Sequence, residues 1–359
     1  MTVQSDAPPR QAFHELRVAA VEPLTADSVA VTFDVPESLA EVFDFHAGQS
    51  LTLRRIIDGV EHRRTYSLCG PTGNRPRIGV REIPEGLFSS WLVRHVEAGM
   101  IVEVAPPSGS FSIKNGTSGR HLCIAAGSGI TPMLSIAATV LRDPGAEVTL
   151  LYGNRTTASV MFAEELADLK NAFPQRFNLI HVLSREARDV DLFSGRLDAE
   201  RLRALLTQLI PLAAVDHVWL CGPLGMLTDV RSVLTDFGFP ASRVHFELFY
   251  VDEPPPEIRR GSPGTGTPTS EVTAILNGRS STITVQSEQT ILDAVQQVRT
   301  DVPFACKGGI CGTCRAVVRN GTVEMARNYA LEADELAAHM VLTCQSRCTS
   351  TTVTVDFDV

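Results

Sequence analysis

The pattern of hydrophobic and polar positions changes twice along this chain. In the first third, short runs in which apolar and polar residues alternate are separated by Pro and Gly, as at residues 28–33 and 77–81. A period of two is typical of strands with one buried face, and short strands at close spacing predict a small antiparallel β-barrel. One amphipathic helix is expected at residues 87–95.

Beyond residue 116, apolar runs alternate with amphipathic helical stretches. The apolar runs are at residues 121–126, 148–152, 179–183 and 217–221. Strands buried on both faces that alternate with helices predict an α/β fold, a parallel sheet covered by helices. The helices are expected at residues 131–141, 162–172, 199–206 and 224–237.

A third pattern fills the rest of the chain. Residues 251–270 are rich in Pro, Gly, Ser and Thr, which is typical of a linker. Residues 271–359 open with two strand-like runs and a helix at 291–298, enough for one small α+β domain. The expected domains are therefore 1–115, 116–250 and 271–359.

Length and charge narrow the class of protein. At 359 residues the chain is longer than one hydrophobic core usually supports, and its net charge of −9 offers no basic surface to nucleic acid or anionic membranes. Residues 1–10 contain no apolar signal segment, which favours a cytoplasmic location. The uncharged run at 122–141 has the length of a membrane span, but Gly127, Gly129 and Pro132 interrupt it. We interpret it as a strand, a loop and a helix, and expect no membrane partner.

Cysteines near the C-terminus have the spacing of a metal site. The motif C-x4-C-x2-C and a later cysteine in Leu-Thr-Cys-Gln are formed by Cys306, Cys311, Cys314 and Cys344. This is the plant-type arrangement for a [2Fe-2S] cluster. A zinc site, which usually pairs two C-x2-C knuckles, and buried free thiols are the alternatives. Cys348 competes with Cys344 as fourth ligand, and we expect Cys348 to be a spare thiol.

Two short motifs in the barrel region suit a flavin nucleotide. In Arg-Thr-Tyr-Ser at residues 64–67, alternation places Arg64 and Tyr66 on one face, where a guanidinium suits a pyrophosphate and a phenol ring suits stacking on a flavin. Gly-Leu-Phe-Ser at residues 86–89 begins the expected helix, whose free N–H groups can receive a phosphate. A surface arginine and a core tyrosine are the alternative interpretation of the first motif.

Loops at the ends of the expected parallel strands suit a nicotinamide nucleotide. Gly-Ser-Gly-Ile-Thr-Pro at residues 127–132 lies between a strand and a helix that Pro132 can begin, so its N–H groups would face a phosphate. The third glycine of the dinucleotide fingerprint is missing, so a turn without a ligand is the alternative. Further candidate loops are at residues 152–156, 183–185 and 221–226. Because the carboxyl ends of parallel strands meet at one edge, these loops are expected to form one site.

Taken together, these motifs resemble those of a known family. R-T-Y-S, G-x-x-S, G-S-G-I-T-P-M, Y-G-N-R-T and C-G-P-x-x-M are similar to the ferredoxin-NADP reductase superfamily, and the cysteine motif is similar to plant-type ferredoxins. The order of the domains, with Y-G-N-R-T and the N-Y-A-L-E at residues 328–332, more narrowly resembles the reductase components of phenylacetyl-CoA epoxidases. The resemblance covers nearly the whole chain and implies a β-grasp fold for the last domain. Cys348 departs from the family pattern.

The resemblance implies roles for individual residues. Arg64 and Ser89 would contact flavin phosphates, and Tyr66 would stack on the flavin ring. Ser67, near flavin N5, and Cys221, near the nicotinamide ring, are the expected catalytic contacts. The other residues expected at the cofactors are Thr65, Val80, Arg81, Gly86, Phe88, Gly127, Gly129, Thr131, Pro132, Ser184, Gly222, Pro223, Met226, Glu247 and Phe249. The alternatives are a buried strand-end thiol for Cys221 and a core aromatic residue for Phe249.

The expected function follows from matching the redox groups. A nicotinamide gives up two electrons together and a [2Fe-2S] cluster accepts one at a time, so a flavin, FAD by the resemblance, must stand between them. Arg155 and Arg185 suit a 2′-phosphate, which favours NADPH over NADH. The expected acceptor is a separate oxygenase, the phenylacetyl-CoA epoxidase. A ring-hydroxylating dioxygenase or a steroid hydroxylase is the alternative acceptor, and a redox-responsive binding protein is an alternative of another class.

Overall fold

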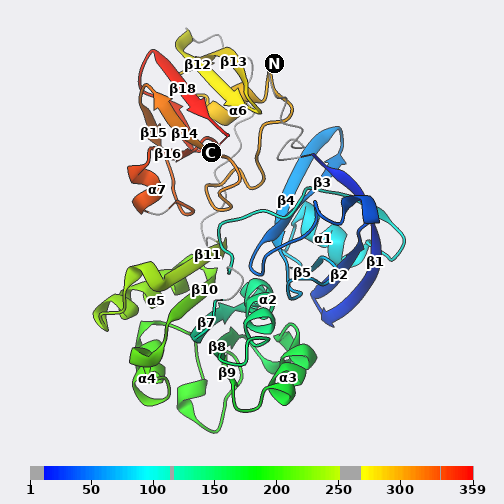
Figure 1. The fold of residues 1–359 in the computed structure, drawn as a ribbon, viewed down its shortest axis with the longest axis vertical. Coiled ribbons are helices and arrows are strands. Elements are labelled where there is room, and N and C mark those ends of the chain that lie inside the picture. Colours follow the sequence, from blue (N-terminus) through cyan, green and yellow to red (C-terminus); the bar gives the residue numbers. More distant parts are fainter. Residues whose placement is uncertain (1–11, 114–116, 251–267, 332, 359) are drawn as a thin grey trace.

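The computed structural model describes residues 12–113, 117–250, 268–331 and 333–358. The chain forms three lobes, an N-terminal barrel, a central α/β domain and a C-terminal domain that touches both (Figure 1). The expected fold class is confirmed in all three lobes. Most of the expected linker, residues 251–267, lies outside the described residues, and its last residues begin a strand.

The N-terminal lobe is a barrel of antiparallel strands. Its elements are β1 (His14–Thr25), β2 (Ser28–Asp34), β3 (Ser50–Ile57), β4 (Val60–Ser67), β5 (Arg77–Arg81), α1 (Leu87–Arg94) and β6 (Ile101–Val104). The strand order is β4-β3-β6-β1-β2-β5, and a bridge between Leu68 and Ile78 joins the two edges. Inward side chains such as Leu16, Phe33 and Leu53 are fully buried, because alternation sends every second residue to the interior.

The central lobe is a parallel sheet between layers of helices. Its elements are β7 (Arg120–Ala126), α2 (Ile130–Val140), β8 (Glu147–Asn154), α3 (Ala163–Ala172), β9 (Phe177–Leu183), α4 (Ala199–Gln208), β10 (His217–Pro223), α5 (Leu224–Asp236) and β11 (Val244–Tyr250). The strand order is β11-β10-β7-β8-β9. The chain adds β8 and β9 on one side of β7 and then crosses over to place β10, parallel to β7, on the other side. Such a switch point opens a crevice at the carboxyl ends of the strands, where ligands bind in open α/β sheets.

Two hydrophobic cores lie on opposite faces of this sheet. One core joins α2 and α3 to barrel residues, among them Ala30 and Phe111, so the barrel and the central lobe share buried surface. The other core contains α4 and α5, and Ile310 and Tyr329 of the C-terminal lobe pack against it. Apolar side chains therefore contribute to both of these contacts between lobes.

The C-terminal lobe is a mixed sheet with one short helix in its core. Its elements are β12 (Pro268–Leu276), β13 (Arg279–Gln286), α6 (Ile291–Val295), β14 (Arg315–Asn320), β15 (Val323–Met325), α7 (Ala333–Ala337), β16 (Met340–Leu342), β17 (Ser346–Cys348) and β18 (Thr352–Asp356). The order β13-β12-β18-β14-β16, with β12 and β18 parallel, agrees with the implied β-grasp fold. The expected helix is shorter than the sequence pattern suggests.

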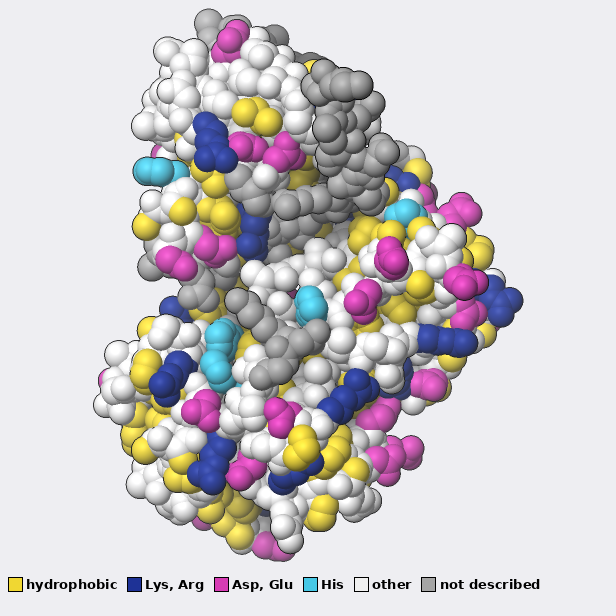
Figure 2. Space-filling model, viewed as in Figure 1, with side chains coloured by type: hydrophobic (Ala, Val, Ile, Leu, Met, Phe, Trp, Pro, Cys, Tyr) yellow, Lys and Arg dark blue, Asp and Glu magenta, His cyan; other side chains and the backbone are white. Residues whose placement is uncertain are grey.

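No helix among the described residues is long and apolar enough to cross a membrane. The run at 122–141 is divided into β7, a turn and α2. On the face drawn in Figure 2, Lys and Arg side chains are interspersed with Asp and Glu side chains.

Candidate functional site

The cysteine motif folds into a loop in which backbone N–H groups face sulfur. The amides of Gly308 and Cys311 donate to Cys306 Sγ at 3.3 and 3.4 Å, and Thr313 Oγ1 donates to Cys311 Sγ at 3.1 Å. The Cys311 thiol and these amides lower the pKa of Cys306, whereas the same pairing and burial raise the pKa of Cys311. N–H groups directed at sulfur stabilise thiolates, the form that ligates iron.

The four predicted ligands lie in two pairs. The Cys311 thiol is hydrogen-bonded to Cys306, and the Cys314 thiol is hydrogen-bonded to Cys344 and lowers its pKa. No three His, Cys, Asp or Glu side chains of the described segments could hold a single metal ion. Four cysteines in two pairs would supply the four thiolates of a [2Fe-2S] cluster.

Cys348 lies apart from these pairs. It ends β17, opposite Val323 of β15, and is half-buried. That Cys348 is a spare thiol stays a prediction.

The flavin motif occupies the end of strand β4. Ser67 is buried there, and its hydroxyl donates to Glu247 Oε2 of the central lobe at 2.9 Å. Tyr66 lies beside Phe88 of α1, with ring centroids 6.3 Å apart, and Arg64 is exposed. The motif thus faces the boundary between two lobes, where a planar ring can be held between them.

The second flavin motif is engaged in local bonds. The hydroxyl of Ser89 accepts from the amide of Ile83 at 3.0 Å, and Gly86 precedes α1 as its N-cap. Arg81 donates to the carbonyl of Ser159, across the lobe boundary, and Val80 is buried in the barrel. Contacts of Ser89 and Arg81 with a cofactor stay predictions.

The glycine turn after β7 packs too closely against its neighbours to carry a side chain at Gly129. Gly127 has a φ of +55°, and a Cβ on Gly129 would lie 2.2 Å from the carbonyl oxygen of Cys221. Thr131 is fully buried and donates to the carbonyl of Ser128 at 3.0 Å. A bare backbone at the start of a helix lets a phosphate approach N–H groups closely, so the turn fits a nucleotide.

Helix α2 begins earlier than predicted. Its first residue is Ile130, so Pro132 is the third residue of the helix and not the first. The prediction is wrong by two positions because the turn at Gly127–Gly129 is itself helical. Proline is tolerated in the first turn of a helix because the N–H that it lacks would have no intrahelical acceptor there.

Backbone bonds bring the two predicted phosphate-binding arginines together. The amide of Ser184 donates to the carbonyl of Asn154 at 2.9 Å, and that of Arg185 donates to the carbonyl of Arg155 at 2.8 Å. These bonds extend the β8–β9 pairing beyond the strands, and both arginine side chains are exposed. Two exposed arginines therefore lie on neighbouring segments at the ligand-binding edge of the sheet.

Strands β10 and β11 bring Cys221 and Glu247 side by side. The two residues are paired in register. Burial raises the pKa of the Cys221 thiol well above its usual range, and the neighbouring Glu247 adds to the shift. Burial also raises the pKa of Glu247 to about 7, and the Ser67 hydrogen bond opposes this rise. Cys221 is therefore a neutral thiol at physiological pH, suited to contact and not to nucleophilic attack.

The remaining predicted residues are divided between the site and the core. Gly222 and Pro223 end β10 at the switch point, and Met226 packs against Gly222. Phe249 packs against the core beneath α2, which agrees with its alternative interpretation.

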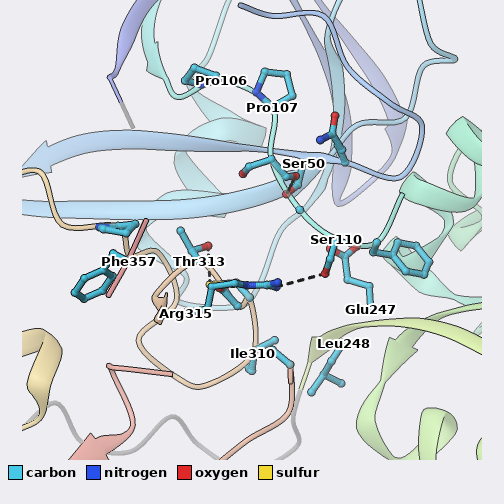
Figure 3. A pocket seen from close by; sticks show the side chains of 18 of the residues that line it. Ser50, Pro106, Pro107, Ser110, Glu247, Leu248, Ile310, Thr313, Arg315 and Phe357 are labelled. Atoms are coloured by element: carbon cyan, nitrogen blue, oxygen red, sulfur yellow. Dashed lines mark hydrogen bonds between the residues drawn. The ribbon is translucent and has the colours of Figure 1, made fainter. Parts of the chain in front are cut away.

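A cavity of about 850 Å³ lies where the three lobes meet. Figure 3 shows Ser110 of the barrel, Glu247 and Leu248 of β11, and Ile310 and Arg315 of the C-terminal lobe around it. Cys311 and Thr313 line the same cavity, so the cluster loop and Glu247, the hydrogen-bond partner of Ser67, border one space. The sequence patterns did not reveal the part of this wall formed by Pro106, Pro107 and Ser110.

Comparison with known proteins agrees with the lobes. Family models match at residues 15–113 (oxidoreductase FAD-binding domain), 123–232 (oxidoreductase NAD-binding domain) and 274–349 (2Fe-2S iron-sulfur cluster binding domain). The phthalate dioxygenase reductase structure superposes with a TM-score of 0.61 at 24% identity, covering 96% of this chain and 98% of that one. At that identity the likeness concerns the fold alone.

Two curated relatives align over nearly the whole chain. One of the subunits of the 1,2-phenylacetyl-CoA epoxidase of Escherichia coli (strain K12) is 43% identical over 96% of this chain and 98% of its own length. The ferredoxin reductase component of the 3-ketosteroid-9-alpha-monooxygenase of Rhodococcus rhodochrous is 32% identical over 95% and 96%.

Fold, site and family models together define an NAD(P)H-dependent oxidoreductase with FAD, a pyridine nucleotide and a [2Fe-2S] cluster as its redox groups. Within that class, the chain belongs to the family of oxygenase reductase components that includes this subunit of the phenylacetyl-CoA epoxidase.

Proposed function

We propose that this protein carries electrons from NADPH through FAD and its own [2Fe-2S] cluster to a separate oxygenase, a 1,2-phenylacetyl-CoA epoxidase. The observation that supports this acceptor is the 43% identity to the epoxidase subunit, which extends over 96% of the chain. Identity to the steroid monooxygenase reductase is lower, at 32%.

The site residues have distinct tasks in this proposal. When bound, the flavin accepts a hydride from the nicotinamide and passes electrons singly to iron. Ser67 and Glu247 form a hydroxyl–carboxyl pair at the lobe boundary that can hold or move a proton there. Tyr66 stacks on the ring, and Arg64 with the α1 N-terminus binds its phosphates.

The nicotinamide nucleotide is held by the edge of the parallel sheet. Backbone N–H groups at Gly127–Gly129 bind its pyrophosphate, and Cys221 contacts the nicotinamide ring as a neutral thiol. Arg155 and Arg185, joined through their backbones, bind the 2′-phosphate that distinguishes NADPH from NADH. Cys306, Cys311, Cys314 and Cys344 ligate the cluster.

Reconstitution tests the acceptor. Purified protein is mixed with the oxygenase component of a phenylacetyl-CoA epoxidase, NADPH and phenylacetyl-CoA, and in parallel with a 3-ketosteroid hydroxylase and with a ring-hydroxylating dioxygenase. Turnover with the epoxidase alone supports the proposal. Preferential turnover with either of the other oxygenases would identify that oxygenase as the acceptor, and the proposed path from NADPH to the cluster would still stand.

A further inference from the structure

The barrel and the C-terminal lobe meet at a buried arginine that none of the expected cofactor roles uses. Arg63 directly precedes the Arg-Thr-Tyr-Ser motif in β4, yet only 3% of its surface is exposed. Its Nη1 donates to the carbonyl of Val302 at 3.3 Å, and its guanidinium lies 4.1 Å from the centroid of the Phe304 ring. Both partners belong to the C-terminal lobe.

The two ends of this contact are close to the two redox sites. Arg63 is one residue from Arg64, and Phe304 is two residues before the cluster ligand Cys306. The ammonium group of Lys307 lies 5.1 Å from the centroid of the same Phe304 ring and bonds to Asp293 and Gln296, which fixes the start of the cluster loop to its own domain. Arg63 is therefore linked to the cluster loop through one ring, that of Phe304.

The charge of Arg63 explains why the contact is specific. A buried cation is costly unless it is paired, and Arg63 is paired within the barrel by Glu61 and across the boundary by the Val302 carbonyl and the Phe304 ring. Removing its side chain leaves that carbonyl and carboxylate without this donor. A second bond between the same lobes joins Arg315 to Ser110 at 3.3 Å (Figure 3).

We propose that Arg63 is a positioning residue that holds the [2Fe-2S] domain against the flavin domain and so sets the rate of electron transfer from flavin to cluster. Electron tunnelling weakens steeply with distance, whereas hydride transfer involves only the barrel and the central lobe. The inference rests on the proposed path from flavin to cluster, and it predicts that the two steps respond differently to the loss of Arg63.

Anaerobic stopped-flow spectroscopy with NADPH separates the two steps, because flavin bleaching and cluster bleaching have different spectra. In Arg63→Ala we expect flavin reduction to stay within about twofold of wild type and cluster reduction to fall at least about tenfold, equivalent to about 1.4 kcal/mol. Arg63→Lys, which retains a cation and a donor, should fall between the two. Arg55→Ala is the matched control, because Arg55 stacks on Trp91 at 4.4 Å inside the barrel, and both rates should be unchanged.

A measurement that does not depend on electron transfer distinguishes loss of this contact from a general folding defect. Hydrogen exchange of the backbone amides in residues 299–305 should accelerate in Arg63→Ala and not in Arg55→Ala, because only the former exposes that segment. Phe304→Leu, made on the opposite side of the contact, should reproduce the selective loss, and the double variant should lose no more than Arg63→Ala alone.

The outcomes distinguish two claims, the path of electrons from flavin to cluster and the clamp, which is the contact of Arg63 with Val302 and Phe304. If wild-type flavin is bleached and its cluster is not, the proposed path is wrong and the clamp with it. If the wild-type cluster is reduced and Arg63→Ala reduces it equally fast, or slows both steps to the same extent, the path stands and the clamp is refuted.

Discussion

In the cluster loop, one short segment supplies three of the four proposed ligands, and two of its backbone amides face the sulfur of Cys306. The nicotinamide edge is built differently, because its turn, its arginine pair and Cys221 come from four separate strand ends. The first site depends on a few irreplaceable side chains, and the second depends on backbone geometry with side chains that adjust affinity. Substitutions should therefore have all-or-none effects in the first and graded effects in the second.

The largest effect is expected for Cys311→Ser. Loss of a thiolate ligand should abolish the cluster and lower NADPH-dependent reduction of cytochrome c by more than about a hundredfold, while flavin bleaching by NADPH stays within about twofold. Cys348→Ser is the matched control, and its cluster absorbance and rates should equal those of wild type. An intact cluster in Cys311→Ser, or a lost one in Cys348→Ser, would show that the ligand assignment is wrong.

A smaller effect is expected for the arginine pair. The double variant with Arg155→Ala and Arg185→Ala lacks the two charge-assisted hydrogen bonds proposed to the 2′-phosphate. Its kcat/KM for NADPH should fall by about tenfold to a hundredfold, with little change for NADH. Arg120→Ala, the control, removes one arginine charge at the opposite end of the sheet and should alter kcat/KM for neither nucleotide. Equal losses with both nucleotides would argue against a 2′-phosphate site.

Backbone geometry is tested at Gly129. A Cβ there would overlap the carbonyl oxygen of Cys221, so Gly129→Ala should destabilise the nicotinamide domain by about 1–3 kcal/mol and weaken nucleotide binding. Gly225→Ala is the control, because nothing lies within 4 Å of a Cβ at that position. Thermal unfolding and nucleotide titration measure the two effects. If the two alanine variants behave alike, the turn does not require a bare backbone.

The smallest effect concerns Glu247. Because burial raises its pKa from 4.5 to about 7, its contribution to stability is present below pH 4.5 and is lost as pH rises to about 7. The free energy of unfolding of wild type relative to Glu247→Gln should therefore fall by on the order of 1 kcal/mol between about pH 5 and about pH 8. A pH-independent difference between the two proteins would mean that the carboxyl is not perturbed.

The sequence predicted best what is local. The cysteine spacing identified a loop whose sulfurs the structure pairs, and hydrophobic periodicity located the strands and most helices. Errors arose where neighbouring segments decide the boundary, as at Pro132, where a helical turn of Gly127–Gly129 extends α2, and at α6, which ends at Val295.

Contacts between lobes could not be predicted. Ser67 contacts Glu247, and Arg63 contacts Phe304, only when the domains have docked. Hydrophobic periodicity and motif spacing carry no information about how domains dock. In the sequence, Arg63 fits the pattern of an ordinary strand residue, so nothing there indicates that it is buried. The parts of the site that depend on long-range docking therefore require the structure.

The central claim, that electrons pass from nicotinamide through flavin to the cluster of this same chain, is tested by anaerobic titration of the purified protein with NADPH. We expect the flavin and cluster absorbances to bleach in sequence, with three electrons taken up per chain, two by flavin and one by the cluster. Bleaching of the flavin with an unchanged cluster would contradict the account.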